Sequence, residues 1–101
     1  MKENNMQNIR ISGNNIKLVF DTPGNWAPAG MGRCFLDRIV INENLPKDIQ
    51  ANTLMHELVH CIADQNDLQI NDNETEISVI ANNLHAILKD NKKLVKQIWE
   101  L

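Results

Sequence analysis

Two histidines and a glutamate stand close together in the middle of the chain, as His56, Glu57 and His60. On a helix, residues four apart lie one turn above the other on the same face, so the two imidazoles could bind one metal ion. Glu57 would lie about 100° further around the helix, where its carboxylate could reach a water molecule on the metal. This is the arrangement of the HExxH motif, which combines two zinc ligands with one general base.

The residues around the motif favour a metal site over a chance occurrence. Leu58 and Val59 between the histidines are uncharged, and so are the immediate neighbours of the motif on both sides. The motif also uses two of the three histidines of the chain. The alternative is a helix with surface histidines and an ion-pairing Glu57, but the apolar surroundings match what the motif requires.

A catalytic zinc ion usually has three protein ligands and one water molecule, so a third ligand must come from elsewhere. Asp64 continues the helical face of His56, but it lies about 12 Å further along the axis and is too far away. No glycine turn leads from His60 to another histidine, which excludes the metzincin arrangement. The remaining source is the start of the next helix, where Glu74 and Glu76 stand.

Both glutamates could instead have a structural role at the start of the helix. Acids favour the first turn of a helix because of the helix dipole, and Asn73 with Glu76, or Asn71 with Glu74, has capping-box spacing. One glutamate can therefore be part of a cap while the other is the ligand. We favour Glu74 as the ligand, because it lies on the same helical stripe as Ile77, which should face the first helix.

The first part of the chain has the patterns of β-strands. Short alternating runs at residues 9–11 and 16–20 flank a turn-like segment and predict a hairpin. A third strand is predicted at residues 33–42, after a loop rich in proline and glycine. We expect residues 1–10 to form a flexible N-terminus.

The second part of the chain has helical spacing of its apolar residues. The expected helices cover residues 47–65, 74–89 and 94–101, with Pro46 at the start of the first and a polar break between the first two. The sequence therefore predicts a single α+β domain over residues 1–101, with a small antiparallel sheet of about three strands followed by two or three helices.

Several pieces of the chain resemble one peptidase family. They are Gly32 to Cys34 leading into Ile39 to Asn42, then Thr53 to His60, and finally Glu74 to Leu84. Over about residues 33–91, the chain resembles the small zincin-like metallopeptidases of phages and prophages, which are related to the ImmA/IrrE-type peptidases in the gluzincin class.

This resemblance implies both a third ligand and a fold. In that family the third ligand is an acid three residues before an apolar position, followed by an apolar–alanine pair. Glu74, Ile77 and Ile80-Ala81 match this pattern, whereas Glu76 does not. The implied fold is a minimal zincin-like fold, in which a small antiparallel sheet packs on an active-site helix and a ligand helix. Its strand at residues 33–42 would line the substrate groove, where a peptide can add as an extra strand.

The bulk composition narrows the partners and the location. A formal net charge of -3 and scattered basic residues give no electrostatic footprint for nucleic acid, and no membrane partner is indicated. No apolar segment follows Lys2 as in a secretory signal, so we expect a cytoplasmic protein. Cys34 and Cys61 are then expected to be buried thiols, although one disulfide between them stays open.

The predicted function is that of a zinc-dependent metallopeptidase acting on a peptide or protein. His56, His60 and Glu74 would hold one Zn²⁺ ion with water as the fourth ligand, and Glu57 would be the general base. An oxyanion-stabilising residue is not evident: the chain has no tyrosine, His85 lies about 16 Å beyond Glu74 along the helix, and Arg33 and Arg38 are further candidates.

The alternative is a catalytically inactive regulatory or interaction module whose zinc is structural. Structural zinc sites usually have four protein ligands, and Cys34 is the residue that could supply the fourth. A metal-free interaction domain would require the motif to be a coincidence.

Overall fold

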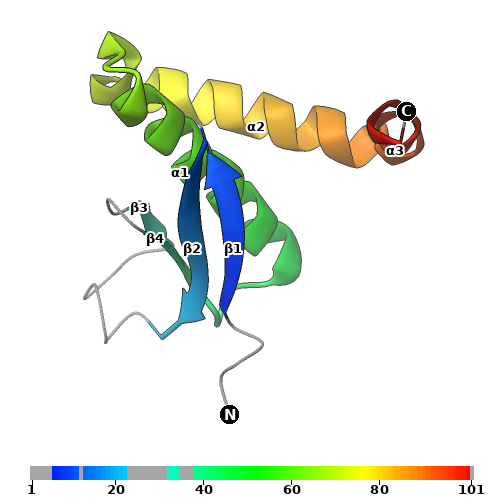
Figure 1. Cartoon of the computed structure of the whole chain (residues 1–101), viewed down its shortest axis with the longest axis horizontal. Coiled ribbons are helices and arrows are strands. Elements are labelled where there is room, and N and C mark those ends of the chain that lie inside the picture. Colours follow the sequence, from blue (N-terminus) through cyan, green and yellow to red (C-terminus); the bar gives the residue numbers. More distant parts are fainter. Residues whose placement is uncertain (1–5, 12, 23–31, 35–37, 101) are drawn as a thin grey trace.

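The part of the chain that the computed structural model describes, residues 6–11, 13–22, 32–34 and 38–100, has its strands first and its helices second (Figure 1). This confirms the predicted α+β class. The elements are β1 (Met6–Ile11), β2 (Asn14–Asp21), β3 (Gly32–Cys34), β4 (Arg38–Asn42), α1 (Lys47–Gln65), α2 (Glu74–Asp90) and α3 (Lys92–Trp99), with a short 3₁₀ helix, Gln69–Asp72, between α1 and α2.

The first two strands form the predicted antiparallel hairpin. Ile11 pairs with Asn14, so the turn between them is only two residues long, and Gly13 in this turn has a φ of 82°. Glycine adopts this left-handed conformation without the steric cost that a side chain would add. Strand β1 begins at Met6, so residues 6–10 belong to the sheet and not to the flexible N-terminus that we expected; residues 1–5 lie outside the described part.

The sheet differs from the prediction in strand number and in direction. The single strand expected at residues 33–42 is divided into β3 and β4, which pair antiparallel to each other. The strand order is β1-β2-β4-β3, and β4 runs parallel to β2, with Leu18 opposite Ile39. The sheet is therefore a mixed four-stranded sheet within the described residues. A parallel pair requires the chain to cross back to the other end of the sheet, and residue alternation carries no signal for such a crossing.

Helix α1 packs on this sheet and forms the main core with it. Ile39 and Ile41 of β4 are fully buried, and Leu54 and Leu58 of α1 pack against the same cluster. Cys61 on α1 is also part of this core and is disulfide-bonded, which is the state that the sequence left open and not the expected thiol. The side chain of Cys34 lies outside the described residues. This core fixes the position of α1 relative to the sheet.

The buried apolar contacts of α2 with α1 come from the first half of α2. Ile77 and Ala81 are fully buried against Val59 of α1. The sequence predicted that the whole apolar stripe of α2 would face α1, but Leu84 and Leu88 are 41% and 39% exposed. The reason is visible in Figure 1, where α2 extends past α1 and the sheet toward α3. Among the described residues, no helix has both the length and the apolar character needed to cross a membrane.

The contact between β3 and α1 depends on a glycine. A Cβ atom on Gly32 would lie 2.7 Å from Cγ2 of Thr53 and 3.1 Å from the carbonyl oxygen of Val40. Gly32→Ala is therefore expected to destabilise the protein by about 1–3 kcal/mol, because the buried Thr53 has little room to move. Urea unfolding measures this loss. The double variant Gly32→Ala/Thr53→Ser, which lacks the clashing methyl group, should recover part of the stability; no recovery would contradict this account.

Candidate metal centre

Helix α1 carries the two histidines on one face. The helix begins and ends at the predicted residues, Lys47 and Gln65, with Pro46 as the residue before its first turn. The imidazole rings of His56 and His60 have centroids 4.9 Å apart, and their side chains are 23% and 19% exposed. Both rings are thus partly withdrawn from water and close enough to share one ligand.

The connection after α1 brings a carboxylate to the same place. Asp67 adopts a positive φ of 53° directly after α1, and the 3₁₀ helix then leads into α2, which folds back against α1. Glu74 is the first residue of α2, and one of its carboxylate oxygens lies 3.0 Å from Nε2 of His56. Its other oxygen contacts Nε2 of His60. The ligand atoms of these three residues lie within 4.8 Å of one another, so the group could hold a metal ion.

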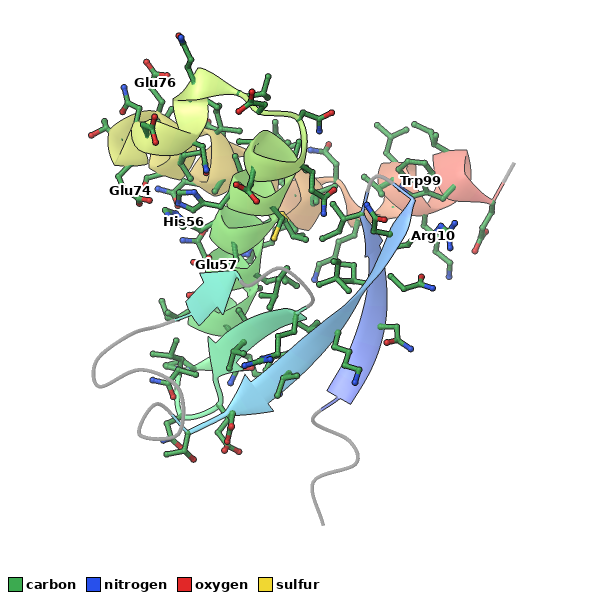
Figure 2. All side chains as sticks on the ribbon, turned by 60° about the vertical axis from the view of Figure 1, so that its left-hand side comes forward. Arg10, His56, Glu57, Glu74, Glu76 and Trp99 are labelled. Carbon is green, nitrogen blue, oxygen red and sulfur yellow. The ribbon has the colours of Figure 1, made fainter. Side chains whose placement is uncertain are left out.

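The two glutamates of the first turn have different positions. The side chain of Asn73 caps α2 by accepting a hydrogen bond of 3.1 Å from the backbone N–H of Glu76. Glu76 therefore belongs to the cap, whereas Glu74 contacts both imidazoles. Figure 2 shows Glu74 beside His56, with Glu76 on the outer side of the same helix.

Asn71 makes a contact with the site that the sequence analysis did not foresee. Its side-chain oxygen lies 2.8 Å from Nδ1 of His60, so the imidazole donates from Nδ1, and Nε2, which faces Glu74, is the nitrogen that a metal would use. Residues that fix the tautomer and orientation of a histidine ligand in this way commonly strengthen metal binding. From the sequence, Asn71 was a candidate only for a helix cap. Its place in the connection between the two ligand-bearing helices is the signal that could have identified it.

The electrostatic surroundings of His60 favour a positive charge. Burial lowers the pKa of His60, but the hydrogen bond with Asn71 and the negative charges of Glu74 and Glu57 outweigh this effect and leave the pKa above its usual value. A proton and a metal ion compete for the same Nε2 atom. The surroundings that stabilise the proton in the metal-free protein therefore also suit a bound cation.

Glu57 lines the same open pocket as two of the proposed ligands, His56 and Glu74. This pocket has a volume of about 440 Å³, and its lining is small or polar: Gly32, Asn52, Thr53, His56, Glu57, Glu74, Ser78 and Asn82. The sequence analysis did not identify Asn52, Thr53, Ser78 or Asn82, although Asn52 and Ser78 stand four residues from His56 and Glu74 on the same helical faces. Glu57 thus lies beside the group that could hold a metal, without being part of it.

Other residues considered from the sequence lie elsewhere or outside the described part. His85 is half-buried at the far end of the α1–α2 contact, where its Nδ1 lies 3.0 Å from the side-chain oxygen of Asn52. It does not line the pocket, and neither does Arg38 of β4. Asp64 is exposed and is not among the clustered ligands. The side chains of Arg33 and Cys34 lie outside the described residues, so an oxyanion-stabilising role for Arg33 and a zinc-ligand role for Cys34 stay predictions.

The donor set fits zinc. Two imidazole nitrogens and one carboxylate oxygen form the usual ligand set of catalytic zinc sites such as that of thermolysin, which leave a further position open. Cys61 cannot close this position, because it is buried in the sheet-side core. Within the described residues, no fourth His, Cys, Asp or Glu joins the cluster.

Comparison with known proteins gives one family match. Residues 15–89, about three quarters of the chain, match the model of a peptidase family that is described as the IrrE N-terminal-like domain. The matched region extends from β2 to the end of α2 and includes all the residues of the candidate centre. Neither the curated proteins nor the solved structures gave a match.

The metal content of single variants tests the ligand set. Wild-type protein supplied with Zn²⁺ is expected to retain about one ion per chain in elemental analysis. Glu74→Ala should lose most of it, because only two ligands remain. Glu76→Ala is the matched control from the same helical turn and should keep the ion. Equal zinc in the two variants would refute Glu74 as a ligand.

The contribution of Asn71 is tested by zinc affinity in competition with a chelating dye. Asn71→Ala removes the acceptor for Nδ1–H of His60, and the zinc affinity is expected to fall about 10- to 100-fold. Asn71→Asp keeps an acceptor oxygen at this position and should bind zinc at least as well as wild type. An unchanged affinity in Asn71→Ala would show that the contact does not support the ligand.

Proposed function

We propose that this chain, which belongs to the peptidase family of the IrrE N-terminal-like domain, is a zinc-dependent metallopeptidase acting on a peptide or protein. The observation that carries the proposal is the convergence of Nε2 of His56, Nε2 of His60 and the carboxylate of Glu74 beside an open pocket. The resemblance to peptidases of phages and prophages extends the proposal to a role in a mobile element.

His56, His60 and Glu74 would hold the ion, and Glu57 would move the proton. Bound zinc supplies a Lewis acid that polarises the scissile carbonyl and lowers the pKa of a water molecule. The carboxylate of Glu57 would accept a proton from the water molecule that attacks the carbonyl carbon. Glu57 then donates the proton to the leaving amine nitrogen, so that the C–N bond breaks and a carboxylic acid and an amine are formed.

The substrate would lie along β3. In the described part of the sheet, β3 is an edge strand that pairs only with β4, and Gly32 at its start lines the pocket. An extended peptide can add to such an edge through main-chain hydrogen bonds. The strand expected at residues 33–42 was the candidate for this role, and its second part, β4, lies inside the sheet. This leaves β3 as the docking edge.

The general-base role is tested by replacing Glu57 with its neutral isostere. Glu57→Gln should retain zinc but lose at least about 99% of its activity, because the amide cannot accept the proton of the water. Activity is measured on fluorescein-labelled casein and on a library of quenched fluorescent peptides. Asp64→Asn is the matched control, since it removes an exposed carboxylate of the same helix.

Two other results would contradict the proposal. If Glu57→Gln cleaves as fast as wild type, another residue is the base. If wild-type protein binds one zinc ion but cleaves nothing in either assay, the alternative of an inactive zinc-binding module gains support over the peptidase.

A further inference from the structure

The pocket continues beyond the proposed ligands as a polar strip between the two helices. On α1, Asn52 stands one turn before His56, and on α2, Ser78 and Asn82 stand one and two turns after Glu74. All of them line the same pocket as Glu57. The facing surfaces of α1 and α2 thus carry metal-ligating groups at one end and amides at the other.

A directional chain of hydrogen bonds orders these amides. The side-chain oxygen of Asn52 lies 3.0 Å from Nδ1 of His85, and its Nδ2 donates to Oδ1 of Asn82 over 2.9 Å. With Asn52 oriented in this way, Nδ1 of His85 is the donor. The oxygen of Asn82 thus accepts from Asn52, and the exposed Nδ2 of Asn82 carries two N–H donors at the pocket. Among the described residues, no hydrogen bond satisfies these two donors.

The distance of these donors from the metal ligands indicates which part of a substrate they could bind. One helical turn separates Asn52 from His56, which is about 6 Å along the axis. An extended peptide advances about 3.4 Å per residue, so Asn82, which is bonded to Asn52 but stands about 12 Å beyond Glu74 along α2, would lie opposite the substrate about two to four residues from the scissile bond. The acceptor that every peptide presents at each residue is its main-chain carbonyl.

We infer that Asn82 is a substrate-binding residue whose Nδ2–H donates to a main-chain carbonyl of the peptide, with Asn52 and His85 as positioning residues that fix its amide orientation. The inference rests on the proposed function, because it requires the peptide to run from the metal ligands along the pocket. Recognition of the main chain agrees with the small and polar side chains that line the pocket among the described residues.

The test measures binding of hydroxamates to the zinc-loaded full chain by titration calorimetry. Acetohydroxamate binds only the metal. An N-acetyl-triglycine hydroxamate extends from the metal-binding group in one chain direction, and a malonyl hydroxamate coupled to glycylglycinamide extends in the other. In wild type, one of the two extended probes is expected to bind more tightly than acetohydroxamate, because it reaches Asn82.

Asn82→Asp is the decisive variant. Aspartate keeps an oxygen that accepts from Asn52, so the link between the helices is retained, but it has no N–H to donate. The better extended probe should bind about tenfold more weakly, while acetohydroxamate binding is unchanged. Asn83→Asp introduces the same charge one residue later, where the amide donates to the carbonyl of Val79, and it should leave both affinities unchanged.

The positioning residues have their own readout. His85→Ala should weaken the extended probe about threefold without affecting acetohydroxamate, because Asn52 and Asn82 lose their fixed orientation. His85→Gln offers an amide N–H in place of the imidazole donor and should restore part of the affinity. If the hydrogen bonds between His85, Asn52 and Asn82 were purely structural, His85→Ala would lower the melting temperature. It would leave the ratio of the affinities for the extended probe and acetohydroxamate unchanged.

The outcomes separate this inference from the proposed function. If the wild-type protein fails to bind zinc or acetohydroxamate, the proposed function fails and this inference fails with it. If acetohydroxamate binds but neither extended probe binds more tightly, or if Asn82→Asp binds the better probe as wild type does, the inference alone is overturned.

Discussion

The candidate centre depends on the contact of one carboxylate, that of Glu74, with the two imidazoles of His56 and His60. These groups come from two helices, and a shift of one helix along the other by a fraction of a turn would separate them. The distance between the helices is set by the buried contact of Ile77 and Ala81 with Val59. Ala81 allows a close approach because its side chain is small, and the connection through Asp67 and the 3₁₀ helix sets where α2 begins.

The sheet acts on this arrangement through α1. The apolar residues of β2 and β4 hold one face of the helix in a core, so the opposite face, which bears the histidines, is turned toward α2. The close contact of Gly32 with Thr53 places β3 against the same helix beside the pocket. The sheet thus fixes one side of α1, and the pocket lies on its other side. This arrangement can keep the ligands rigid while giving a substrate access to them.

The parts of the structure that follow local rules could be predicted from the sequence. The bounds of α1 agreed with the prediction, because apolar spacing and Pro46 are local signals. Helical geometry also placed His56 and His60 together, and the stripe shared with Ile77 selected the glutamate that contacts them. The family match agrees with the resemblance to ImmA/IrrE-type peptidases that the same residues indicated.

The remaining differences have physical reasons. The parallel pairing of β2 with β4 depends on how the chain crosses the sheet, which alternation does not encode. Leu84 and Leu88 in the second half of α2 follow the same apolar spacing as the buried Ile77 and Ala81, so periodicity alone could not show that they are exposed. Asn71, Asn52 and Asn82 were missed because asparagine is common in caps and loops, and only the fold shows which of them meet a histidine.

The position of the site along the chain also bears on how the protein folds. The candidate centre is made from one continuous stretch, Lys47–Gln65 and Glu74–Asp90 with the short connection between them, and its contact between His56 and Glu74 spans 18 residues. The pairing of β2 with β4 spans a similar length, 21 residues from Lys17 to Arg38. The entropic cost of closing a loop grows only slowly with its length, so the helical pair and the sheet have similar costs and are expected to form together in one cooperative transition.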